Sequence, residues 1–192
     1  MTSQIVYPPY TLAIGIGANL PSAFGSPIST LVAVRPKVEN EICLWIQSSL
    51  TAKISYKTIH KDLRWRWSDL FETDPIGGPE NQPNYINTAL LVDGEPLRNI
   101  FPTHHGAEDL LQNFLKLEKE FGRDRESSTS RWMPRTLDID LLSWGSLQIN
   151  SKLLTLPHPR MTERSFVITP LADALNKGEK PPKKIETKIP WE

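Results

Sequence analysis

The sequence contains a single cysteine and carries no net charge. Cys43 is alone among 192 residues, which excludes a disulfide within the chain and a cysteine-rich zinc site, and suits a reducing compartment. Lys plus Arg and Asp plus Glu number 22 each, so no basic field would recruit nucleic acid or an anionic membrane. Any anion-binding site must therefore be local, and we expect a cytoplasmic protein.

Long apolar runs, sequence repeats and low-complexity segments are also missing. The first 34 residues have no charged side chain and no histidine, but they lack the basic start of an export signal, and prolines and glycines break the apolar run. The segment GIGANL from Gly15 has neither the Lys-Ser/Thr ending of a P-loop nor the full GxGxxG spacing. We expect one untargeted domain over residues 1–192 that binds phosphate in another way.

Alternating and helical patterns along the chain predict an α+β fold. Strands are predicted where apolar residues alternate or run together, at residues 10–17, 64–71, 85–92 and 136–144. Helices are predicted where apolar residues recur at helical spacing, at residues 28–50, 108–121 and 161–175, the first kinked or split at Pro36 and the last broken at Pro170. The order βαββαβ is that of a sandwich with helices packed on a largely antiparallel sheet.

The segments between these elements have the composition of turns and loops. Residues 73–84 hold three prolines and two glycines, and a loop of this length inside a domain is commonly functional. A Gly-Ser pair after the strand at 136–144 predicts a hairpin with residues 147–149. Residues 123–131 are polar and rich in serine and arginine, so we expect a mobile loop there, and a poorly ordered tail over residues 176–192.

The run RWMPRTLDIDLL, from residue 131, places two aspartates on one face of a predicted strand. Asp138 and Asp140 point the same way, because alternate side chains of a strand share a face. A solvated strand face is the ordinary explanation of such a pair. The arginines near it favour a site for metal-bound polyphosphate instead, because oxygen ligands hold Mg²⁺ and guanidinium groups bind phosphate. These arginines are Arg123, Arg125, Arg131 and Arg135.

Further candidates each have an ordinary alternative. His158 lies between two prolines in the run PHPRMTER, near Arg164, where a phosphate contact competes with a structural role. Tyr85 and Asn87 share one strand face and suit a flat heterocycle, although a plain polar face is the simpler explanation of these two alone. Glu118 lies on the apolar flank of a predicted helix, where a carboxylate would meet a ligand or an arginine.

Four motifs together resemble one known family. They are GANL from residue 17, FETDPIGGPENQPNYINTALL from residue 71, RWMPRTLDIDLL, and LPHPRMTERSFVITPLAD from residue 156. Their arrangement is similar to that of 6-hydroxymethyl-7,8-dihydropterin pyrophosphokinase of folate biosynthesis, over about residues 10–22 and 64–175. The resemblance implies a ferredoxin-like α+β fold and transfer of pyrophosphate from ATP to the pterin, releasing AMP. We also expect a monomer and, from the balanced charge, no nucleic-acid or membrane partner.

The resemblance also implies roles for individual residues. Asp138 and Asp140 would bind two Mg²⁺ ions that bridge the ATP phosphates. The remaining catalytic residues would be Arg123, Arg135, His158 and Arg164. The nucleotide would be bound by Glu118, Arg125, Arg131 and Trp132, the last closing over the site. The pterin would be bound by Thr73, Ile76, Tyr85, Asn87 and Phe166, with the two aromatic rings on either side of it.

The chain also departs from the family pattern. Residues 22–63 form a longer segment than is usual, Ala18 stands where serine is usual, Glu126 falls where some members have a basic residue, and residues 127–130 lengthen the arginine loop. Two other hypotheses stay open. An RNA-binding module would explain the runs RWRW, GRDR and SRW, but not the paired aspartates. A relative without activity would be supported by Glu126 and residues 22–63 alone.

Overall fold

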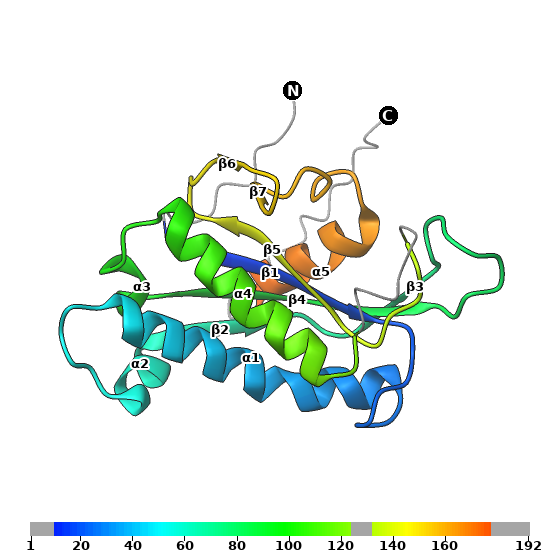
Figure 1. Cartoon of the computed structure of the whole chain (residues 1–192), viewed down its shortest axis with the longest axis horizontal. Helices are drawn as coiled ribbons and strands as arrows, with labels where there is room; N and C mark the ends of the chain where they lie inside the picture. Colours follow the sequence, from blue (N-terminus) through cyan, green and yellow to red (C-terminus); the bar gives the residue numbers. More distant parts are fainter. Residues whose placement is uncertain (1–9, 124–131, 178–192) are drawn as a thin grey trace, which may run out of the picture.

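A five-stranded sheet runs through the molecule (Figure 1). The computed structural model describes residues 10–123 and 132–177. The strands of the sheet are β1 (Leu12–Ala18), β2 (Leu63–Trp67), β3 (Phe71–Thr73), β4 (Tyr85–Gly94) and β5 (Asp138–Trp144). Their order is β2-β4-β1-β5, β3 also pairs with β4, and all of these pairings are antiparallel. The predicted α+β class with a largely antiparallel sheet is confirmed.

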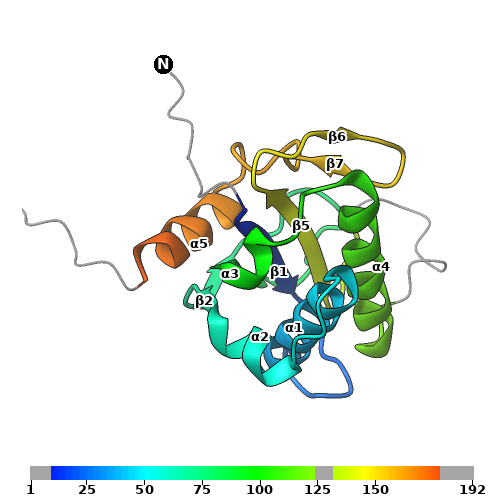
Figure 2. The ribbon, with the colours of Figure 1, turned by 90° about the vertical axis from the view of Figure 1, so that its left-hand side faces the viewer.

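Helices cover both faces of this sheet. They are α1 (Pro27–Ser49), α2 (Tyr56–Asp62), α3 (Glu95–Arg98), α4 (His104–Glu120) and α5 (Ser165–Asn176). Figure 2 shows α1, α2 and α4 on one side of the strands and α5 on the other. The strand β1 serves both layers, because Ile14 and Ile16 belong to the larger core while Ala13 belongs to a smaller core with Leu171 of α5.

Helix α1 covers nearly the predicted residues and contains a proline. Ser26 caps the first turn by accepting a hydrogen bond from the Ser29 backbone N–H at 3.3 Å. Buried side chains then recur at helical spacing, including Leu31, Val34, Val38 and Ile42. The helix is continuous through Pro36, which is exposed, so of the predicted kink or split the split does not occur, and the kink stays a prediction. Packing of one apolar face outweighs the hydrogen bond that the proline removes.

The predicted strand at residues 64–71 is interrupted. Strand β2 ends at Trp67 and β3 begins at Phe71, because Ser68 turns its hydroxyl into the sheet, where it accepts a hydrogen bond from the Ala89 N–H at 2.9 Å. The two strands both pair with β4, which begins at Tyr85 as predicted but continues to Gly94, two residues beyond the predicted end. The long loop at residues 74–84 follows β3 and leads into β4.

Three other boundaries differ from prediction. The segment after β5 forms no hairpin with it, because β6 (Ile149–Asn150) pairs with β7 (Thr155–Leu156). Helix α4 begins four residues before the predicted start, capped by Thr103, and α5 begins at Ser165 and continues through Pro170.

Residues 124–131 and 178–192, where a mobile loop and a tail were predicted, lie outside the described residues. No helix within the described ranges is long and apolar enough to cross a membrane.

Candidate active site

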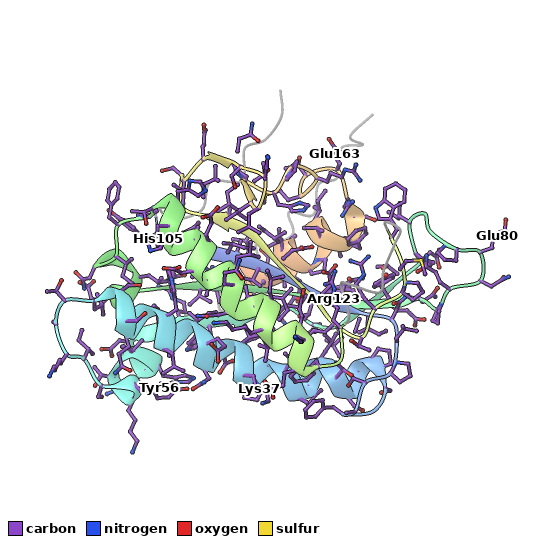
Figure 3. All side chains as sticks on the ribbon, viewed as in Figure 1. Lys37, Tyr56, Glu80, His105, Arg123 and Glu163 are labelled. Carbon is purple, nitrogen blue, oxygen red and sulfur yellow. The ribbon has the colours of Figure 1, made fainter. Side chains whose placement is uncertain are left out.

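A cavity of about 710 Å³ lies where β1, β4 and β5 meet the loop at residues 74–84 and the start of α5. Most of the residues singled out in the sequence line it. They are Thr73, Ile76, Tyr85, Asn87, Arg123, Trp132, Arg135, Asp138, Asp140, His158, Arg164 and Phe166. Arg125 and Arg131 lie outside the described residues. In Figure 3, Arg123 lies just beyond the end of α4, while Glu80 marks the outer end of the loop.

The two aspartates of β5 lie beside glycines of β1. In the register of these strands Asp138 is opposite Gly17 and Asp140 is opposite Gly15. Residues opposite each other in an antiparallel pair point to the same face, so the neighbouring strand places no side chain against either carboxylate. The GIGAN run therefore adds no side chain beside the acidic pair, and its two glycines lie against Asn87 and Leu142.

Arginines neutralise Asp138. Nη1 of Arg135 donates to Oδ2 of Asp138 at 2.6 Å, and the Arg123 guanidinium contacts Oδ1 of the same carboxylate. The Asp140 carboxylate makes no hydrogen bond or ion pair with any residue that the structure describes. Burial, together with the negative charges of Asp138 and Glu118, raises the pKa of Asp140 to about 7 against the opposing effect of Arg123 and Arg135. A cation at this position would relieve that penalty.

Glu118 lies beneath the cavity wall. Its carboxylate is 1% exposed and accepts from Nη1 of Arg123 at 2.7 Å and from the Ile139 N–H at 2.8 Å. Gly122, at a φ of +85°, ends α4 and turns the chain so that Arg123 points back over the helix end. Of the two alternatives left by the sequence, the contact with an arginine is the one observed. The nucleotide-binding role of Glu118 stays a prediction.

An amide and two aromatic rings occupy another wall. The Asn87 side chain is 7% exposed and donates to the Thr73 hydroxyl at 2.8 Å, which fixes the direction of its carbonyl oxygen. Tyr85 and Phe166 line the cavity, the first from β4 and the second from α5. The guanidinium of Arg164 lies 5.3 Å from the centre of the Phe166 ring. Such a wall suits a flat, polar-edged ring.

Trp132 lines the cavity and lies against Gly77 of the loop at residues 74–84. Its side chain is 44% exposed, and a Cβ added to Gly77 would lie 2.6 Å from its ring. The Arg160 guanidinium lies 5.9 Å from the centre of the same ring.

Burial and the charge of Arg164 lower the pKa of His158, so the imidazole is largely neutral at pH 7.

Some residues of the site were not singled out from the sequence. Asp74, Gln82 and Thr136 line the cavity, and all three lie inside the motifs that carry the resemblance. A second cavity of about 310 Å³ shares Asp140 and His158 with the first. Its other walls are mainly aliphatic, from Leu111, Leu115, Leu141, Leu153 and Leu154.

Residues 13–176 match the family model of 7,8-dihydro-6-hydroxymethylpterin-pyrophosphokinase. The chain belongs to this family. Among curated relatives, the 2-amino-4-hydroxy-6-hydroxymethyldihydropteridine pyrophosphokinase of Bacillus subtilis is 38% identical over 120 residues, which cover 62% of this chain and 64% of the relative. The enzyme of that name from Synechocystis is 39% identical over 110 residues, covering 56% and 48%. The mitochondrial folate synthesis bifunctional protein of Arabidopsis thaliana is 31% identical over 163 residues, covering 80% and 27%.

The family resemblance predicted from the motifs is thereby confirmed. The chain spans less than two thirds of the length of these pyrophosphokinase relatives, 64% and 48% respectively. The RWRW run is partly exposed: Arg64 is exposed and Trp65 is half-buried, whereas Arg66 and Trp67 are buried. Arg66 is paired with Asp93 at 2.7 Å, and Trp67 is buried and donates to Glu39 at 2.8 Å.

Proposed function

We propose that this protein transfers pyrophosphate from ATP to 6-hydroxymethyl-7,8-dihydropterin, giving AMP and the pterin diphosphate, as a step of folate biosynthesis. One observation carries the proposal. The cavity joins a carboxylate and guanidinium cluster, suited to polyphosphate, to a wall of aromatic rings and an amide, suited to a pterin. Family membership supports the same assignment.

Asp138 and Asp140 fit a magnesium site. The described ranges contain no group of three or more acidic, histidine or cysteine side chains placed to hold a metal ion. Magnesium nevertheless binds through one or two carboxylates when substrate phosphates and water supply the other ligands. A cation bound here would also offset the burial and the neighbouring negative charges that raise the pKa of Asp140. Two Mg²⁺ ions held here would neutralise the ATP phosphates and lower the pKa of the attacking hydroxyl.

The protein itself would supply positioning and charge. Tyr85 and Phe166 would hold the pterin ring between them, and Asn87 would bind its edge. The hydroxymethyl oxygen would attack the β-phosphorus in line as its proton passes to solvent water; the new oxygen–phosphorus bond forms, and the bond from the β-phosphorus to the oxygen that it shares with the α-phosphorus breaks to release AMP. Arg123 and Arg135 would stabilise the charge that develops on the phosphate oxygens.

The base of the nucleotide would lie in the second cavity. That cavity is mainly aliphatic and opens beside Asp140 and His158, so a triphosphate reaching from it would enter the carboxylate cluster. His158 and Arg164 would then contact phosphate oxygens, and Trp132 would close over the site together with residues 74–84. Arg125 and Arg131 are proposed to bind the nucleotide on the strength of the resemblance alone. One domain over residues 1–192, a cytoplasmic location and a monomer stay predictions.

The test separates nucleotides after the purified protein is incubated with MgATP, with and without the pterin. AMP that forms only with the pterin supports the proposal, whereas ADP, or no turnover, overturns it. Asp138→Asn should lower turnover by at least ~10²-fold, because it removes a charge that the transition state requires. The matched control is Asp109→Asn, an exposed carboxylate on α4 paired with His105, which should leave turnover unchanged. An RNA-binding protein would be indifferent to both variants.

A further inference from the structure

Asn19 is a buried side-chain amide at the end of β1. The residue is 1% exposed and follows Ala18, the last residue of the strand. A buried amide has a donor group and an acceptor group to satisfy, and leaving either unpaired costs free energy. Asn19 itself is not one of the described residues that line the large cavity. Its bonds therefore act on the cavity through other residues.

These bonds reach two separate segments of the chain. The Asn19 Nδ2 group donates to the Pro83 carbonyl at 3.0 Å and to Oε1 of Gln82 at 3.3 Å, both in the loop at residues 74–84. Its Oδ1 accepts from the Arg135 N–H at 2.8 Å. The backbone N–H groups of Asn19 and Leu20 both donate to the Arg135 carbonyl at 3.0 Å. One side chain thus ties the loop to the segment that precedes β5.

Each segment continues to a different part of the site. On the loop side, Nε2 of Gln82 donates to the Gly77 carbonyl at 2.6 Å, which folds the loop back on itself beside Trp132. On the other side, the Arg135 side chain pairs with Asp138 at 2.6 Å. A continuous series of hydrogen bonds therefore runs from the loop at residues 74–84, through Asn19 and Arg135, to Asp138.

We propose that Asn19 is a positioning residue. It holds the loop at residues 74–84, which would bind the pterin, at a fixed separation from Arg135. The inference rests on the proposed function, because it assigns the loop to the pterin and Arg135 to phosphate. With both segments tied to one amide, the hydroxymethyl group of a bound pterin is presented at a constant distance from the phosphate-binding cluster. Asn19 touches neither substrate, so its effect is exerted wholly through Gln82 and Arg135.

Three variants separate positioning from simple stabilisation. Asn19→Asp keeps the acceptor for the Arg135 N–H but loses both hydrogen bonds to the loop, and Gln82→Ala removes one of these two bonds while that to the Pro83 carbonyl stays. The matched control is Asn84→Ala, because Asn84 lies in the same loop but its amide donates to Glu72 at 3.1 Å instead. Asn84 is not among the described residues that line the cavity.

The kinetic test measures KM for each substrate and kcat. Asn19→Asp and Gln82→Ala should each raise the pterin KM about tenfold, the scale on which one buried hydrogen bond acts, with KM for MgATP within about twofold. The double variant should have less than the sum of the two single effects, because the bond between Asn19 and Gln82 is lost in both. Additive effects, an equal rise in both KM values, or the same rise in Asn84→Ala would overturn the proposal.

Hydrogen exchange tests the link without requiring turnover. In Asn19→Ala, amide exchange should rise together in residues 74–84 and at the Arg135 N–H, while exchange in β4 stays as in the unaltered protein. No change in the loop would sink the positioning role, whatever the kinetics show. If the unaltered protein makes no AMP, the proposed function fails, yet the exchange result still decides whether Asn19 ties the two segments together.

Discussion

Glu118 and Arg123 form an ion pair with a distance of 2.7 Å between Oε1 and Nη1, and the carboxylate side of it is completely buried. The same Nη1 atom also donates to the Leu137 carbonyl at 3.1 Å and contacts Asp138. Glu118 thus anchors the guanidinium that neutralises one of the two site aspartates. Removing one partner of a buried pair is costly because the other charge loses its compensation.

Glu118→Gln should therefore weaken both activity and stability. We expect turnover to fall at least ~10-fold and the free energy of unfolding to fall by about 1–3 kcal/mol, since an amide replaces the charge at Arg123. Steady-state kinetics and denaturant unfolding measure the two quantities. The matched control is Glu108→Gln on the same helix, whose partner is His104 near the surface. Unchanged turnover in Glu118→Gln would refute the anchoring role.

Glycine is required at residue 17 because the Asn87 side chain occupies the space of a Cβ atom, and not because of the backbone conformation. A Cβ at Gly17 would lie 2.6 Å from Oδ1 of Asn87, whose amide is held on its other side by Thr73. Gly17→Ala should turn this amide away and raise the pterin KM about tenfold, with little change in MgATP binding. The comparison is Gly15→Ala on the same face, where a Cβ meets only Leu142 methyl groups at 3.4 Å. Equal effects of the two variants would contradict this explanation.

Much of the site could be predicted because its residues follow strand periodicity. The face shared by Asp138 and Asp140 and the face shared by Tyr85 and Asn87 both depend on alternation alone, which is a local property. The partners of these residues are not local. That Glu118 anchors Arg123 was left as one of two alternatives, because the choice depends on how α4 ends relative to β5.

The wrong predictions of helix ends and of the hairpin share a cause, because both features depend on tertiary contacts rather than on the local sequence. Pro36 was expected to kink or split α1 and Pro170 to break α5, but neither proline splits its helix, because burial of one helix face outweighs a missing hydrogen bond. The hairpin predicted after β5 rested on a Gly-Ser turn. The turn exists, with the Leu147 N–H donating to the Trp144 carbonyl at 3.0 Å, but β6 then pairs with β7. Which strand is available for pairing is a tertiary fact that a turn signal does not contain.

Pro36→Ala should stabilise the protein. Pro36 lies in the interior of α1 on its exposed side, so alanine restores a backbone donor while little packing is lost. We expect the free energy of unfolding to rise by about 1–3 kcal/mol, as interior helix propensities indicate. Urea unfolding measures it, and kcat should not change because the helix lies away from the cavity. A loss of stability would mean that the ring contributes more than its missing donor costs.

Cys43 should be chemically silent in the folded protein. It is fully buried in α1, and burial together with the negative charge of Glu39 raises the pKa of its thiol from 9.0 to about 12. At neutral pH, iodoacetamide should label it only after guanidinium is added. Because the folded state retains the proton more tightly, stability should fall as the pH rises from 9.0 towards 12. Cys43→Ala should remove that part of the fall, and rapid labelling without denaturant would show that the thiol is accessible.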